Sequence, residues 1–112
     1  MMKYDKNYYN GLNKNKFARA MRAEGIPVST GYTPLNKQGV IEYHLDSRAF
    51  KTVFSKERLE KYRRENHCPA NDRICEETGL WLGQYVLLGT KKDMADIAAA
   101  IVKIQKNSVK FI

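Results

Sequence analysis

Two histidines and two cysteines come first, because imidazole and thiol groups are common carriers of nucleophilic catalysis and metal binding. They are His44, His67, Cys68 and Cys75. His67 and Cys68 are adjacent, so their side chains leave the backbone in different directions and do not by themselves form a Cys–His nucleophilic pair. The spacing from Cys68 to Cys75 matches no zinc knuckle. We therefore expect free thiols, Cys75 as a small core residue, both histidines in loops, and no catalytic or metal-binding residue among the four.

The carboxylates do not predict an acid–base catalytic site, and the glycines do not predict a nucleotide-binding loop. The acidic pairs Glu76–Glu77 and Asp93/Asp96 fall on predicted helices at capping or solvated positions, and no other acidic cluster faces them. This arrangement does not favour paired general acid and base chemistry. No glycine-rich loop follows a predicted strand and precedes a helix, so the sequence has neither a dinucleotide fingerprint nor a Walker loop. We expect no cofactor-binding residue in this chain.

The surplus of basic residues is a reason to consider anionic partners. The chain has 20 lysines and arginines against 12 acidic residues, a formal net charge of +8. Such a balance is compatible with nucleic acid or another polyanion as a partner. In the segment 56–65, however, basic and acidic residues alternate as on a solvated helix face, and no nucleic-acid-binding signature is present. Nucleic acid is therefore not favoured, and a free-standing basic module for nucleic acid or another anionic partner is the alternative function.

Length and hydropathy place the chain among small single domains. The 112 residues suffice for one hydrophobic core. The longest apolar run, Ile97–Val102, is far shorter than the roughly 18 residues of a membrane span. The first residues lack the apolar segment of a signal peptide. We expect one domain over residues 1–112, a cytoplasmic location and no membrane partner.

The clearest predicted helix covers residues 14–24. Asn13 is a good N-cap residue, and Leu12 and Phe17 have the spacing of a hydrophobic staple. Gly25 offers the left-handed conformation that ends many helices. The sequence therefore predicts both where this helix begins and where it ends.

Caps, prolines and glycines also mark the other elements. Thr90 and Asp93 predict a capping box, and Pro69 has the position favoured for the first residue of a helix. The predicted elements are an edge strand over 26–30, a loop over 31–45, helices over 56–65, 69–78 and 91–106, a strand over 80–88, and a tail over 108–112 that adds a strand or frays. Together they predict an α+β fold, a two-layer sandwich in which helices cover a small, mainly antiparallel sheet.

Six stretches, in this order and at this spacing, resemble one known family region. They are FARAMRAEGIPV from Phe17, GYTPL from Gly31, CPANDRIC from Cys68, WL from Trp81, VLLG from Val86 and DMADI from Asp93. The region is the C-terminal small domain of the DegT/DnrJ/StrS-type aminotransferases. These are pyridoxal-phosphate (PLP) enzymes of fold type I that aminate keto sugars or related cyclic ketones. The resemblance extends over nearly the whole chain.

The resemblance also implies what the chain lacks. In this family the lysine that holds PLP, the acidic partner of the pyridine nitrogen and most of the phosphate cup lie in a large domain that precedes the small one. No position here corresponds to them. We therefore expect that the chain neither binds PLP nor transaminates by itself. Its expected partner is the missing large domain, or a second copy that associates through the exposed apolar face.

The same resemblance points to one loop as the substrate-facing part. In the family, the loop after the Glu-Gly-Ile-Pro strand can approach substrate, and here it is Gly31–Leu35. Tyr32 and Pro34 are the predicted substrate-binding residues, because a tyrosine combines a flat apolar face with a hydroxyl group. The alternative is that both residues only brace the turn. The sequence departs from the family at Gly83, where proline is common, and in the short Met1–Tyr4 segment, which predicts a shortened or missing first strand.

Overall fold

The computed structural model describes residues 1–111, and its chain divides into two compact units. The first, called the sheet unit here, contains residues 1–31 and those from 77 onward. The second, called the helical unit, is the segment 32–76 between them. Two compact units can belong to one domain or to two. The single domain over 1–112 therefore stays a prediction. No helix in residues 1–111 is long and apolar enough to cross a membrane.

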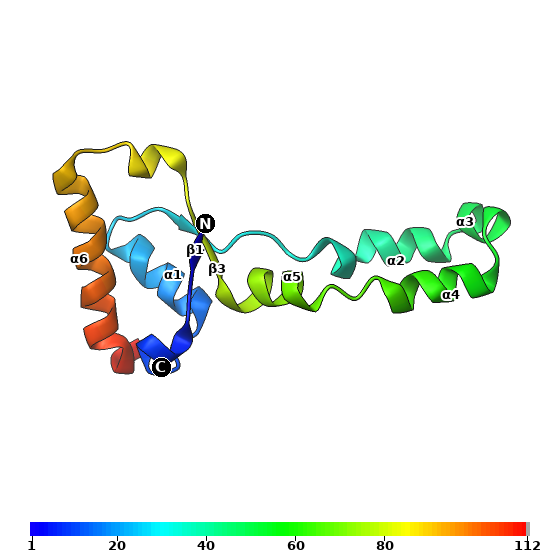
Figure 1. Ribbon diagram of the computed structural model, residues 1–112, viewed down its shortest axis with the longest axis horizontal. Coiled ribbons are helices and arrows are strands. Elements are labelled where there is room, and N and C mark those ends of the chain that lie inside the picture. Colours follow the sequence, from blue (N-terminus) through cyan, green and yellow to red (C-terminus); the bar gives the residue numbers. More distant parts are fainter. Residues whose placement is uncertain (112) are drawn as a thin grey trace. The chain divides into compact units, whose positions relative to one another are not determined.

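A three-stranded antiparallel sheet forms the centre of the sheet unit (Figure 1). β3 (Gly79–Leu82) lies between β1 (Met2–Lys3) and β2 (Val28–Ser29). Met2 pairs with Leu80 in one ladder, and Val28 pairs with Leu82 in the other. The short N-terminal strand and the edge position of β2 were both expected.

The strand predicted over 80–88 is wrong beyond its first part. β3 ends at Leu82, and residues Gln84–Leu87 form a 3-10 helix instead. Both neighbouring strands are only two residues long, so the chain beyond Leu82 has no strand with which to pair. Leu87 and Leu88 are accordingly exposed. Apolar composition alone therefore overstated the length of this strand.

Helices α1 (Lys14–Ala23) and α6 (Lys91–Asn107) pack against each other and enclose the core with the sheet. The core is a single cluster of side chains from all these elements, with Leu12, Phe17, Met21 and Leu80 fully buried. A small antiparallel sheet covered by helices is the expected α+β arrangement, so the predicted fold class is confirmed.

The predicted N-caps of α1 and α6 and the predicted glycine stop after α1 are confirmed. Asn13 accepts a hydrogen bond from the Asn15 backbone N–H at 2.7 Å. Gly25 has a φ of +83°, and the Ile26 N–H donates to the Met21 carbonyl oxygen at 3.0 Å, as in a Schellman motif. α6 begins with the complete Thr90–Asp93 capping box.

The helical unit contains four α-helices, of which sequence patterns predicted two. Predicted were α4 (Lys56–Glu65) and α5 (Pro69–Arg73), which continues as a π-helix over Ile74–Thr78. The loop predicted over 31–45 is wrong in its second half, where a 3-10 helix (Leu35–Lys37) precedes α2 (Gly39–Asp46). α3 (Arg48–Val53) was not predicted. The tail forms a 3-10 helix over Ser108–Phe111, and Ile112 lies outside the described residues.

Ion pairs between exposed side chains join helices of the helical unit. α2 and α4 lie side by side (Figure 1), and Arg63 of α4 reaches both Glu42 and Asp46 of α2 at 3.1 Å. In the segment 32–76, only Pro34, Leu45 and Leu59 are buried. α2 therefore depends on contacts with a later part of the chain, which no pattern local to 39–46 reveals.

Candidate functional site

Gly31 fixes the start of the predicted substrate loop. Its φ is +84°, a conformation that side chains rarely adopt, and its N–H donates to the Ser29 hydroxyl oxygen at 3.1 Å. A Cβ at this position would lie 2.7 Å from both Cε3 and Cη2 of Trp81, and still closer to Cζ3. Only glycine lets the backbone approach the indole ring of β3 so closely.

The two predicted substrate residues have different surroundings. Tyr32 is 81% exposed, so its ring and hydroxyl group are available to a ligand. Pro34 is buried, and its carbonyl oxygen accepts the Lys37 N–H at 3.0 Å, where the 3-10 helix begins. Pro34 therefore has a structural contact in the turn, and the alternative that both residues only brace the turn stays open. Substrate binding by either residue stays a prediction.

A cluster of three charges holds the end of this loop. The Lys37 ammonium lies 2.7 Å from a Glu76 carboxylate oxygen and 3.2 Å from one of Asp72. The hydrogen bond to Glu76, followed by that to Asp72, raises the pKa of Lys37 above its ordinary value. Asp72 and Glu76 are four residues apart on one predicted helix, which is the signal that sequence reasoning missed.

Two buried oxygen atoms beside this cluster have no hydrogen-bond partner within the described residues. They are Oδ1 of Asn36 and Oδ1 of Asp72. The Asn36 amide nitrogen is engaged, since it donates to the Asn66 carbonyl oxygen at 3.3 Å. Buried acceptors are normally paired with protein or water. Neither oxygen is accessible to a ligand from the surface, so they do not by themselves mark a binding site.

The histidines and cysteines are spread over several elements. His44 lies in α2, so its predicted loop position is wrong, because that segment is helical. His67 lies between α4 and α5, as expected. Neither cysteine forms a disulfide, as predicted. Cys75 is only half-buried and is not a core residue, since its helix belongs to the sparsely packed helical unit. Residues 1–111 contain no group of three His, Cys, Asp or Glu side chains that could hold a metal ion.

The comparisons give one distant relative. Over 111 aligned residues, which cover 96% of this chain, the sequence is 24% identical to a Micromonospora echinospora protein assigned as an L-glutamine:3-amino-2,3-dideoxy-scyllo-inosose aminotransferase. The chain spans about a quarter (26%) of that protein's length. No family model and no solved structure matches the chain. The match supports an aminotransferase relationship for this chain.

Proposed function

We propose that the chain is the C-terminal small domain of a PLP-dependent aminotransferase of the DegT/DnrJ/StrS type, acting on a keto sugar or related cyclic ketone. One observation carries the proposal: the similarity to an assigned aminotransferase extends over 96% of this chain but over only 26% of the relative. The confirmed α+β fold and the six family-like stretches agree with it. The remaining part of such an enzyme would be the partner of this chain.

Neither Lys37 nor Lys14 fits the role of holding PLP. A lysine that forms an imine with the cofactor must be able to lose its proton, which a lowered pKa favours. The pKa of Lys37 is raised by Glu76 and Asp72. Buried Lys14 uses its ammonium to donate to the Thr30 carbonyl oxygen at 3.2 Å. The proposal therefore assigns PLP, which carries the amino group when bound, to the large domain.

In this proposal the chain contributes the surface that faces the substrate. The loop leaves Gly31 with a fixed backbone, exposes Tyr32, and is tied down again where Lys37 meets Glu76 and Asp72. A tyrosine ring can cover the apolar face of a sugar or cyclitol ring while its hydroxyl group hydrogen-bonds to a substituent. Tyr32 would thus orient the substrate without taking part in proton transfer.

Cofactor absorbance and activity test the proposal. We expect the purified chain with PLP to show no stable aldimine absorbance band and no transamination. A chimera joins this chain to the part of the Micromonospora echinospora protein that the alignment does not cover. We expect it to show both the aldimine band and transamination with that protein's substrates. In the chimera, Tyr32→Ala should raise KM about tenfold, and Tyr8→Ala, which changes an exposed tyrosine elsewhere, should not. Transamination by the isolated chain, or a chimera that binds PLP without catalysis, would contradict the proposal.

A further inference from the structure

The helical unit buries few side chains for its size. Of residues 32–76, only Pro34, Leu45 and Leu59 are buried. Its α-helices are ten residues long or shorter, and α2 begins without a side-chain cap. Isolated helices of fewer than about 12–15 residues are marginal in water. The helices of this unit therefore depend on contacts with other parts of the chain.

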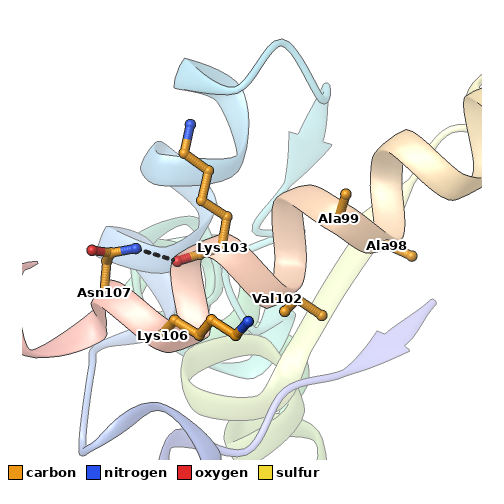
Figure 2. A pocket seen from close by; sticks show the side chains of 6 residues that line it. All are labelled: Ala98, Ala99, Val102, Lys103, Lys106 and Asn107. Atoms are coloured by element: carbon orange, nitrogen blue, oxygen red, sulfur yellow. Dashed lines mark hydrogen bonds between the residues drawn. The ribbon is translucent and has the colours of Figure 1, made fainter.

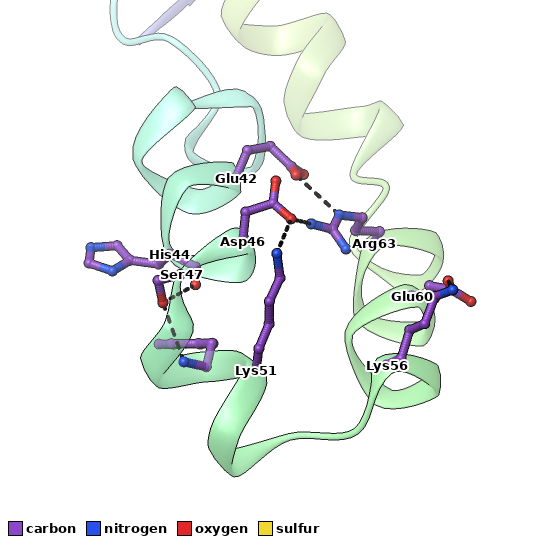
Figure 3. A network of polar contacts seen from close by, with 9 residues as sticks. Glu42, His44, Asp46, Ser47, Lys51, Lys56, Glu60 and Arg63 are labelled. Carbon is purple, nitrogen blue, oxygen red and sulfur yellow. Dashed lines mark hydrogen bonds and ion pairs between the residues drawn. The ribbon is translucent and has the colours of Figure 1, made fainter.

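Charged side chains supply contacts between three of these helices. Arg63 of α4 lies 3.1 Å from both Glu42 and Asp46 of α2. Lys51 of α3 lies 3.5 Å from the same oxygen of Asp46. Figure 3 shows these four side chains pointing toward one another, and we call them the α2–α4 charge cluster. An isolated exposed ion pair contributes little to stability, but a network in which charges share partners contributes more.

A second group of charges joins the beginning of the helical unit to its end. Lys37, in the 3-10 helix, lies 3.2 Å from Asp72 and 2.7 Å from Glu76. The two carboxylates belong to α5 and to the π-helix that continues it. Ion pairs therefore connect every α-helix of this unit either to another helix or to the 3-10 helix.

The sheet unit is stabilised differently. Its core contains ten buried side chains, and α6 has 17 residues and a capping box. Figure 2 shows α6 toward its C-terminal end, where Asn107 donates to the Lys103 carbonyl oxygen at 2.9 Å within the same helix. An ion pair also joins elements here, since the Lys103 ammonium lies 2.8 Å from Glu24. Burial of apolar groups does not depend on charge, so screening by salt spares most of what stabilises this unit.

We propose that the helical unit is an ionic-strength switch: rising salt weakens its charge clusters and opens α2 and α4 from each other, while the sheet unit stays folded. The screening length falls from about 30 Å at 0.01 M salt to about 3 Å at 1 M, which is the length of these ion pairs. Segments with few buried side chains open locally at a lower free energy than global unfolding. Opening also releases the end of the Gly31–Leu35 loop that Lys37 holds. This inference does not depend on the proposed enzyme family.

Hydrogen exchange read by mass spectrometry, at about 0.01 M and about 1 M NaCl, tests the switch. We expect exchange in α2 and α4 of the wild-type chain to become about tenfold faster at high salt, while α1 and α6 stay unchanged and serve as the internal reference. Arg63→Met removes both contacts with α2 and keeps an apolar chain. At low salt, its α2 and α4 should already exchange as the wild-type helices do at high salt, with little further effect of salt.

Two variants are the matched controls. Arg64→Met removes the same charge from the next position of α4, where the arginine has no ion pair within residues 1–111, and it should behave as the wild-type chain does. Lys103→Met removes the ion pair with Glu24 and should leave α1 and α6 protected. The proposal is overturned by equal exchange of α2 and α4 at both salt concentrations, by an equal salt effect in α1 and α6, or by loss of protection in α1 of Arg63→Met. It is also overturned if Arg63→Met keeps the full salt effect or if Arg64→Met acts as Arg63→Met does.

Discussion

Two glycines with nearly equal backbone geometry differ in what lies next to them. Gly25 has a φ of +83°, and a Cβ added there would have no neighbouring side chain within 4 Å. Gly31 has a φ of +84°, and a Cβ added there would collide with the Trp81 ring. Both positions disfavour a side chain through the backbone, but only Gly31 also does so through packing. Comparing the same substitution at both sites separates these two costs.

We predict that Gly31→Ala destabilises the protein more than Gly25→Ala. The left-handed backbone costs alanine about 1–2 kcal/mol at each site, and overpacking against Trp81 adds about 1–3 kcal/mol at Gly31. Urea unfolding measures both losses. Because Trp81 is the single tryptophan of the chain, its emission should change in Gly31→Ala and remain unchanged in Gly25→Ala. Equal losses with unchanged emission would disprove the close approach.

Tyr4 makes the stability of the chain sensitive to alkaline pH. Its buried hydroxyl group donates to the Leu12 carbonyl oxygen at 2.6 Å. Burial, followed by the charges of Tyr9 and Asp5, raises the pKa of Tyr4 from near 10 to about 12. Between these values the unfolded chain releases a proton that the folded chain keeps, so the free energy of unfolding falls as the pH rises.

We predict that the Tyr4 effect lowers the free energy of unfolding by about 2–3 kcal/mol between pH 10 and 12, at about 1.4 kcal/mol per pH unit. Tyr4→Phe should remove this part of the pH dependence. At neutral pH it should cost about 1 kcal/mol, because the Leu12 carbonyl oxygen loses its donor. Tyr8→Phe changes an exposed hydroxyl group and serves as the control. If urea titrations of wild type and Tyr4→Phe stay parallel above pH 10, this account of Tyr4 is wrong.

Elements with signals at their own ends were predictable from the sequence, and elements that depend on distant residues were not. Asn13 with Gly25, and Thr90 with Asp93, mark α1 and α6 locally. The N-cap of α2, by contrast, is Gln38, whose side chain makes no capping hydrogen bond. Its contacts with Arg63 come from more than fifteen residues away.

For the candidate site, the sequence indicated the segment but not how each residue in it is placed. A motif identified the segment that contains Gly31, Tyr32 and Pro34. Sequence alone did not distinguish the exposed Tyr32 from the buried Pro34, because burial depends on the tertiary fold around the loop. The pairing of Lys37 with Asp72 and Glu76 joins segments about forty residues apart, so it required the fold.

Within the helical unit, Leu59 carries a large share of the packing, so we predict that Leu59→Ala opens this unit alone. The expected cost is about 2 kcal/mol or more, since few buried neighbours can replace the lost contacts. Hydrogen exchange should become faster in α2 and α4 and remain slow in α1 and α6. Leu35→Ala removes the same atoms from an exposed position and should change little. Equal loss of protection in α1 would show that both units unfold together.

At the scale of the molecule, the net charge is unevenly shared. The sheet unit has eleven basic and five acidic residues, a net charge of +6, whereas the helical unit has nine and seven, a net charge of +2. If the chain were a basic module for polyanions, the sheet unit would have to provide the binding surface. Its lysines and arginines are partly engaged already, since Lys103 pairs with Glu24 and Arg22 donates to the Val28 carbonyl oxygen.

We predict weak oligonucleotide binding that disappears at physiological salt, because such binding would come from net charge without a built site. A gel shift with mixed single- and double-stranded oligonucleotides, at low and at physiological salt, measures it. Lys16→Glu with Arg19→Glu lowers the charge of the sheet unit by four and should abolish the residual shift, while Arg58→Glu with Arg64→Glu lowers that of the helical unit equally and should have less effect. Tight binding that persists at physiological salt would instead favour the basic module. A surface with specific contacts stays bound at that salt concentration, whereas binding through net charge alone does not.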